Sequence, residues 1–178
     1  MENICSIFND VLGPVMTGPS SSHTAGCARI GKMTRELWGE EIQKARIVFE
    51  KNGSYPSCYM GHGSNYGFIG GLLGYYPEDE RLKDAIEIAI RSDKDIQFCS
   101  EDLGNIHPNQ ARIDIYENGN LAMSLMTFSV GGGMFQIRQM DGFDVMIEGN
   151  RNQYFVACVQ HTCEEQLKEI LKDIPYDV

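Results

Sequence analysis

The sequence predicts an α+β fold in which a mostly antiparallel sheet packs with helices. Helical spacing of apolar residues fills the first half of the 178-residue chain, whereas alternating patterns separated by tight-turn signals fill the second half. Hydrophobic residues make up 42% of the chain and charged residues 22%, which is typical of a protein with a buried core and excludes wholesale disorder.

Four helices are expected within the first 92 residues. The first covers residues 4–12 and is capped by Asn3, and the second covers 25–38 and ends at Gly39. Residues 64–73 predict a third helix despite three glycines, which require close packing against another element. Residues 77–92 predict one amphipathic helix, whose apolar face is Leu82, Ala85, Ile86, Ala89 and Ile90.

Strands are expected mainly in the second half. Asn118-Gly119 between two alternating runs is the strongest hairpin signal, because a type I′ turn needs positive φ at both central residues. Asp141-Gly142 predicts a second hairpin, and the glycines of 129–133 are expected to break the strand before it. The expected strands are 45–49, 111–116, 121–128, 134–140 and 143–148.

The length fits one domain with a short appendage. We expect residues 1–150 to form the domain and 151–178 to form a tail with a strand at 154–159 and a helix at 164–171. Nothing in the N-terminal sequence predicts a signal peptide, and no stretch predicts a membrane span, so the expected location is the cytoplasm with its cysteines as free thiols.

The charge balance argues against two classes of partner. Acidic residues outnumber basic ones by 25 to 15, which gives a formal net charge of −10. A chain this acidic, without a run of lysine or arginine, is repelled by phosphate backbones and anionic lipids. We therefore expect neither nucleic acid nor membrane as a partner.

The segment from Gly18 to Thr24 carries three serines, a histidine and a threonine directly before a predicted helix. A helix N-terminus presents unpaired N–H groups and a partial positive charge, so it attracts carboxylate or phosphate. His23 is a candidate base, and the alternative is an ordinary N-cap in a polar loop. The hydroxyls that add donors for an anion are those of Ser20, Ser21, Ser22 and Thr24.

A second candidate segment is Gly61-His62-Gly63-Ser64. Its glycines allow the backbone to approach a ligand and leave His62 accessible, although a tight turn before a helix explains the same residues. For His107-Pro108-Asn109 a structural turn is favoured, and for 131–133 a bulge between strands.

Cys158, His161 and Cys163 are residue types that bind metals. A structural zinc needs four ligands, normally two spaced pairs, and no second pair is visible in the sequence. The sequence therefore predicts no metal site in this chain.

The run from Gly18 to Gly26 resembles the signature loop of the β chain of iron–sulfur-dependent L-serine dehydratases (L-serine ammonia-lyases). Order and spacing agree with this family over about residues 3–149, and the supporting segments follow. They are Gly61-His62-Gly63-Ser64, Gly70-Gly71-Leu72-Leu73-Gly74, His107-Pro108-Asn109 and Ser129-Val130-Gly131-Gly132-Gly133.

The resemblance implies a reaction in which L-serine loses water and then ammonia to give pyruvate, without pyridoxal phosphate. It implies a 4Fe–4S cluster that is ligated by a separate α chain, and a fold similar to the allosteric substrate-binding domain of phosphoglycerate dehydrogenases. The implied partners are the α chain, in a hetero-oligomer, and L-serine; a homodimer is the alternative state of the isolated chain.

Carried onto this sequence, the resemblance places His23 and His62 as the catalytic pair, with the assignment of base and acid left open. Ser64 stands where the family usually has threonine, which keeps the hydroxyl. The expected substrate-binding residues are Ser20, Ser21, Ser22, Thr24, Gly61, Gly63 and Ser64.

Two other readings of the sequence stay open. The chain is too short after residue 150 for a complete ACT domain, so 151–178 is either a truncated remnant of one or a tail packed on the domain. A non-catalytic module that binds an amino acid explains the same loops, as does a protein whose loops only mediate assembly. The preference between L-serine, D-serine and threonine is also open.

Overall fold

The computed structural model describes residues 15–149 together with Glu169 and Lys172. The expected helix at 4–12, the expected tail elements at 154–159 and 164–171, and the Cys158–Cys163 segment lie outside the described residues, apart from Glu169. The division into a domain of 1–150 and a tail of 151–178 therefore stays a prediction.

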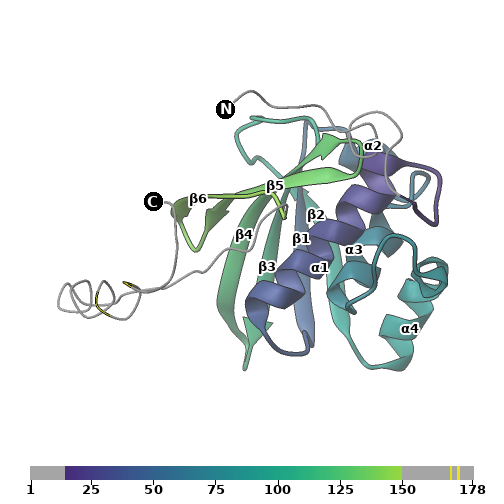
Figure 1. Cartoon of the computed structure of the whole chain (residues 1–178), viewed down its shortest axis with the longest axis horizontal. Helices are drawn as coiled ribbons and strands as arrows, with labels where there is room; N and C mark the ends of the chain where they lie inside the picture. The colour runs from purple at the N-terminus through teal and green to yellow at the C-terminus, as the bar shows by residue number, and fades with distance from the viewer. Residues whose placement is uncertain (1–14, 150–168, 170–171, 173–178) are drawn as a thin grey trace.

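One six-stranded sheet organises the described part of the chain, in the order β2-β1-β3-β4-β5-β6 (Figure 1). Every neighbouring pair is antiparallel except β1 and β2, which are parallel. The α+β class with a mostly antiparallel sheet is thus confirmed, and the sheet is mixed. The strands are β1 (Lys44–Glu50), β2 (Asp95–Glu101), β3 (Gln110–Glu117), β4 (Asn120–Gly131), β5 (Met134–Met140) and β6 (Phe143–Ile147).

Strand β2 was not predicted from the sequence, and neither was the short helix α2 (Tyr55–Cys58). Ile96 and Phe98 alternate with polar residues and pack against the core, so a period of two was present in the sequence. The strand lies parallel to β1 because a helical crossover connects them, as parallel neighbours require.

Two tight turns set the register of the antiparallel strands. Asn118 and Gly119 both have positive φ, as do Asp141 and Gly142, which confirms both predicted hairpins. The expected break at 129–133 is confirmed, although it comes later than residue 128: the register shifts between Ser129 and Gly131, where β4 ends, and the turn to β5 follows directly.

The helices lie beside one another over one face of the sheet (Figure 1). The long helix α1 (Gly26–Trp38) ends at Gly39 in the left-handed conformation, as predicted. The single helix expected over 77–92 is instead a 3-10 turn, Glu80–Asp84, followed by α4 (Ala85–Arg91). The helical segment begins at Glu80 because the side chain of Asp79 caps it by accepting from the Arg81 backbone N–H. Ile90 was placed on the apolar face but is 71% exposed.

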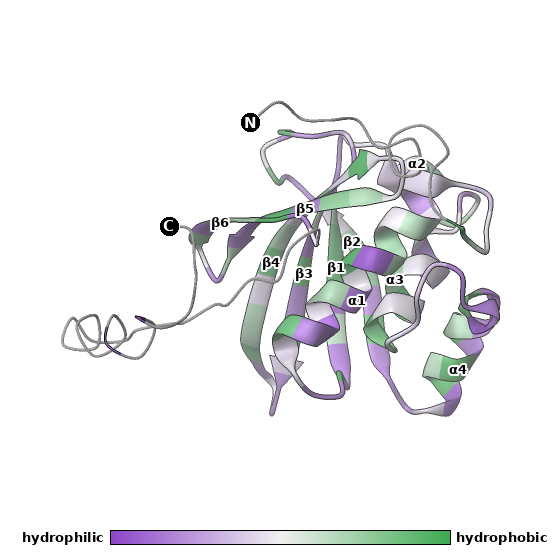
Figure 2. Ribbon diagram, viewed as in Figure 1, coloured by the Kyte–Doolittle hydropathy of each residue, from purple (hydrophilic) through white to green (hydrophobic). Residues whose placement is uncertain are grey.

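The core lies between this helical layer and the sheet. Figure 2 shows apolar residues interleaved with polar ones along the central strands, as expected for a sheet with one covered face. None of the helices in the described ranges is long and apolar enough to cross a membrane. The largest fully buried side chains include Phe49, Tyr55, Phe68, Ile30, Ile47, Ile113 and Leu125.

Helix α3 (Ser64–Leu72) packs closely on α1, which explains its glycines. A Cβ on Gly71 would lie 2.2 Å from the carbonyl oxygen of Ala28, and one on Gly31 would lie 2.5 Å from that of Phe68. Both obstacles are backbone atoms. The helices therefore approach each other as closely as they do only because these positions lack a side chain, which confirms the predicted compensation.

Gly71→Ala is expected to destabilise the protein by about 1–3 kcal/mol, because the added methyl forces two backbones apart. Urea unfolding of the full chain measures this loss. Gly61→Ala is the matched control, since its Cβ would lie 3.9 Å from the nearest atom, and it should stay within about 0.5 kcal/mol of the parent chain. Equal losses in both variants would contradict the packing argument.

Candidate functional site

His23 lies in a π-helical turn, Ser21–Ala25, that leads directly into α1. The sequence predicted an irregular loop here; instead the turn is helical, because Ser20 caps it by accepting a hydrogen bond from the His23 backbone N–H at 3.1 Å. Thr24 and Ala25 at the end of the turn are fully buried. The turn therefore holds the half-buried His23 side chain in a fixed position at the start of a long helix.

His62 comes to the same place from a loop that lies between two helices, α2 (Tyr55–Cys58) and α3. The Thr24 hydroxyl donates a 2.7 Å hydrogen bond to the His62 carbonyl oxygen, which ties the two segments together. Gly63 has φ +75°, and a Cβ there would clash with the Tyr66 ring. The His23 and His62 rings meet edge to face with centroids 5.1 Å apart, and His62 is exposed.

The two ring nitrogens of His23 have different neighbours. Nδ1 lies 3.1 Å from the Ser22 hydroxyl, and Nε2 lies 3.4 Å from the Ser54 hydroxyl. Ser54 donates its one proton to Oδ1 of Asn109, so toward His23 it acts as an acceptor. This network assigns the proton to Nε2 and leaves the lone pair on Nδ1, where the Ser22 hydroxyl donates.

Asn109 and Ser129 connect this network to the sheet. The amide of Asn109 donates to the Ser129 carbonyl oxygen at 3.4 Å, which fixes the orientation of its side chain. The Ser129 hydroxyl donates to the Ser22 carbonyl oxygen at 2.7 Å. His107 accepts from the Asn109 backbone N–H and stacks on Phe128, so it holds the turn, as the sequence favoured.

Burial and charge both favour the neutral form of His23. Burial lowers the pKa of His23 first, and the nearby His62 ring lowers it further. Beneath the pair, burial raises the pKa of the Cys27 thiol to about 12, and the thiol donates to the hydroxyl of the fully buried Tyr55. The floor of the site is therefore uncharged near neutral pH, and its surroundings favour the neutral form of His23.

Glu50 anchors the two loops that bring Ser54 and Asn109 to His23. Its fully buried carboxylate accepts hydrogen bonds from the backbone N–H groups of Asn52, Leu103 and Asn105, at 2.7–3.1 Å. These hydrogen bonds, led by that of Asn52, lower the pKa of Glu50 from its ordinary value of 4.5. One carboxylate thus holds together the segment that follows β1 and the segment that follows β2.

Because the folded state lowers the pKa of Glu50, the unfolded state binds more protons, and the stabilisation is complete above about pH 4.5 and lost as pH falls through the folded-state pKa. Glu50→Gln should therefore lower stability at neutral pH and flatten its decline in acid. Urea midpoints of both chains between pH 3 and 7, roughly the window set by the carboxyl pKa, measure this. Parallel curves would contradict the assignment.

Known proteins are similar to this chain over most of its length. The chain is 47% identical over 153 residues to the probable L-serine dehydratase beta chain of Bacillus subtilis, which covers 85% of this chain and 67% of that protein. The chain belongs to the L-serine dehydratase beta-chain family. A second beta chain, the L-serine dehydratase beta chain of Peptoniphilus asaccharolyticus, is 34% identical and covers 79% of this chain and 63% of that one.

The beta-chain family is also related to a segment of longer proteins. The L-serine dehydratase TdcG of Escherichia coli is 31% identical over 138 residues, which cover 65% of this chain but 30% of that protein. No family model matches the chain. The resemblance drawn from the motifs is confirmed by these relatives, whereas the similarity to an allosteric domain of phosphoglycerate dehydrogenases stays a prediction.

The structure brings together most of the site residues predicted for a serine dehydratase beta chain. The Ser20 and Ser22 hydroxyls lie beside Nδ1 of His23, and the Thr24 hydroxyl donates to the His62 carbonyl oxygen. Ser64 is fully buried at the start of α3, where its hydroxyl is not at the surface. Gly61 is exposed beside His62, and Ser21 begins the π-helical turn. The binding roles of Ser20, Ser21, Ser22, Thr24, Gly61, Gly63 and Ser64 stay predictions.

Sequence analysis missed Ser54 and Cys58 and treated Asn109 and Ser129 only as parts of family segments. Ser54 lies on a short segment without a recognisable motif, and its role depends on Asn109, which is 55 residues away. No local pattern signals such a contact. A polar residue directly before Tyr55-Pro56, where proline restricts the backbone, was the only available hint.

Proposed function

We propose that this chain is the β subunit of an iron–sulfur L-serine dehydratase, which converts L-serine to pyruvate and ammonia together with an α chain. The observation that carries the proposal is the meeting of His23 and His62, whose rings lie 5.1 Å apart although the residues belong to separate segments. Membership of the beta-chain family supports the choice of substrate.

The proposed reaction needs a base for the α-proton and an acid for the departing hydroxide. Breaking the Cα–H and Cβ–O bonds of serine releases water and gives aminoacrylate; its imine tautomer then takes up water and gives pyruvate and ammonia. We assign one histidine of the pair to each proton transfer. The neutral state of His23 suits a base, and the exposed ring of His62 can reach a substrate bound above it.

The substrate carboxylate is proposed to bind at the Ser20–Thr24 turn. The serine hydroxyls of this turn can donate to an anion. The Ser22 hydroxyl would then exchange its present acceptor, Nδ1 of His23, for the carboxylate, whereas the Thr24 hydroxyl stays bonded to the His62 carbonyl oxygen. Ser22 already faces His23 at 3.1 Å, so a carboxylate held there places the α-carbon beside the ring. The turn therefore acts in binding and orientation, while the histidines move protons.

The cysteines of the described residues do not fit a 4Fe–4S cluster, which is held by converging thiolates. Cys27 is buried and bonded to Tyr55, whereas Cys99 contacts Arg46 on the neighbouring strand. We therefore propose that the cluster belongs to the α chain, where it acts as a Lewis acid on the hydroxyl and carboxylate of serine.

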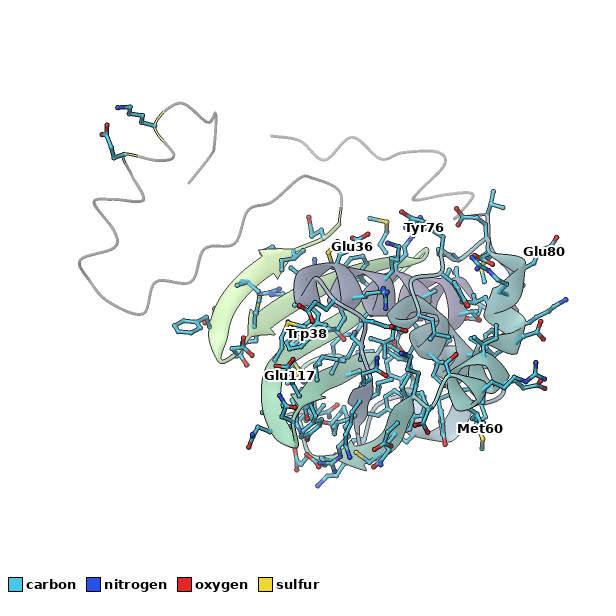
Figure 3. The ribbon with its side chains drawn as sticks, turned by 90° about the horizontal axis from the view of Figure 1, so that it is seen from below. Glu36, Trp38, Met60, Tyr76, Glu80 and Glu117 are labelled. Atoms are coloured by element: carbon cyan, nitrogen blue, oxygen red, sulfur yellow. The ribbon has the colours of Figure 1, made fainter. Side chains whose placement is uncertain are left out.

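Exposed apolar side chains around the site support a partner that covers it. Met60 lies two residues before His62 and is 68% exposed, and Figure 3 shows its side chain pointing away from the body of the protein. Ile106, next to His107, is 72% exposed, and Val130, next to Ser129, is 44% exposed. Three exposed apolar groups, two on loops and one near the end of β4, are suited to a hydrophobic interface.

Anaerobic purification of the tagged chain from its native cells tests the proposal. We expect a second, iron-containing brown chain to copurify, and the complex to form pyruvate from L-serine. If the exposed apolar residues around the site form the interface, Met60→Asp should lower the recovery of the iron-containing partner chain. Ile90→Asp, which replaces an exposed apolar residue on α4, is the matched control. A cytoplasmic location, also a prediction, is tested by fractionating the same cells.

One result would favour the amino-acid-binding module instead. A colourless chain that purifies alone and binds L-serine in calorimetry, with no loss in His23→Ala, would overturn the subunit proposal. Absence of binding at millimolar serine by the lone chain, together with activity of the complex, supports it.

A further inference from the structure

Three side chains that bind soft metals converge beside the histidine pair. The ligand atoms of His23, Cys58 and His62 all lie within 4.8 Å of one another. The sequence predicted no metal site because that prediction rested on ligand pairs spaced closely along the chain, whereas the fold brings these three residues together. Cys58 ends α2 and His62 follows in the next loop, whereas His23 arrives from the other side through the π-helical turn.

Two imidazoles and a thiol form a donor set suited to a borderline or soft divalent ion. Zinc binds cysteine sulfur at about 2.3 Å and histidine nitrogen at about 2.0–2.1 Å, and three protein ligands leave a fourth position for water. Calcium and magnesium prefer oxygen ligands, and this cluster offers none. The chemistry therefore selects Zn²⁺, or Co²⁺ as its spectroscopic substitute.

Only small movements separate the described positions from a bound geometry. Tetrahedral bonds of the lengths above place ligand atoms roughly 3.3–3.6 Å apart, so the set must close by about 1 Å. His62 is exposed and follows Gly61, so its ring is free to turn. The Cys58 thiol now donates to the Ser54 carbonyl oxygen at 2.9 Å, and this proton leaves when a metal binds.

The partners around His23 suit the second shell of a metal ligand. Metal-binding histidines normally donate their other ring N–H to a neighbouring acceptor, which fixes the ring. The Ser22 hydroxyl lies beside Nδ1 and the Ser54 hydroxyl beside Nε2. Whichever nitrogen takes the metal, the other keeps a hydroxyl partner.

We propose that His23, Cys58 and His62 form a three-ligand site for a divalent transition metal of the zinc type, with a water molecule in the fourth position. The site is separate from any iron–sulfur cluster, and its existence does not depend on the proposed reaction. A metal held there occupies both histidines at once.

Anaerobic titration of the purified full chain with Co²⁺ tests the site. We expect binding of one ion with a thiolate-to-metal absorption band, and displacement of the band by Zn²⁺. Cys58→Ser should abolish the band, and His62→Ala should weaken binding at least about tenfold, because each removes a ligand. Cys99→Ser, which changes a thiol of β2, is the matched control and should keep band and affinity.

Several results would overturn the proposal. A band that persists in Cys58→Ser, or that disappears in Cys99→Ser, places the metal elsewhere in the chain. A parent chain with a cooperative urea transition that binds no Co²⁺ also rejects it. Urea midpoints of every variant confirm that a loss of binding does not reflect unfolding.

A consequence for turnover rests on the proposed function. If the histidines act on serine, Zn²⁺ should inhibit the α–β complex, and Cys58→Ser should raise the half-inhibitory Zn²⁺ concentration at least about tenfold relative to its own uninhibited rate. Inhibition unchanged by Cys58→Ser, with Co²⁺ binding lost, would reject this consequence and leave the metal site itself established.

Discussion

If the proposed function is right, His23→Ala in the proposed complex with an α chain is expected to lower kcat for L-serine by about 10²–10⁴-fold, the usual contribution of a positioned acid or base. The ring is held between Ser22 and Ser54, and burial keeps it neutral. No other described residue occupies this position, so water alone would have to remove or deliver the proton.

His62→Ala should lower kcat by a similar factor. Exchange of the α-proton of serine with deuterium from heavy water shows which histidine is the base and which is the acid. The variant that lacks the base loses both exchange and pyruvate formation, whereas the variant that lacks the acid retains exchange. Recovery of the α chain and the urea midpoint serve as controls for assembly and folding. Near-full activity in both variants would reject the assignment of the site.

Ser54→Ala is expected to lower kcat by up to about a hundredfold with little change in KM, because a misplaced catalytic group loses its alignment. The Ser54 hydroxyl accepts a hydrogen bond from Nε2 of His23 and donates one to Oδ1 of Asn109. Without it, the proton on the ring is no longer confined to Nε2. Nitrogen-15 spectra of the histidine ring should then show a mixture of the two tautomers, where the parent chain shows one.

Ser57→Ala is the matched control for Ser54. Ser57 lies in α2, the helix that begins directly after Ser54, and its exposed hydroxyl donates to the backbone carbonyl oxygen of Ser54 and not to the His23 ring. Its removal should leave kcat and the His23 spectrum unchanged. Equal effects of Ser57→Ala and Ser54→Ala would mean that both substitutions act by disturbing the structure of this segment, and would reject the positioning role of Ser54.

Local patterns predicted the elements whose signals are contained within one segment. The Asn118-Gly119 and Asp141-Gly142 turns are present as predicted, because tolerance of positive φ depends on the residue type itself. The prediction of one continuous helix at 77–92 was wrong: a 3-10 turn capped by Asp79 precedes α4, and the periodicity of apolar residues does not reveal this division. Strand β2 was missed although its alternation was present.

The sequence by itself determined the fold class and the family, and it identified His23 and His62 as the residues to examine. Turn chemistry, periodicity and motif order act over short stretches, so they can be read without coordinates. Only the tertiary structure decided that Ser54, Cys58, Asn109 and Ser129 surround these histidines. Their contacts join segments up to 107 residues apart, where spacing along the chain carries no information about distance.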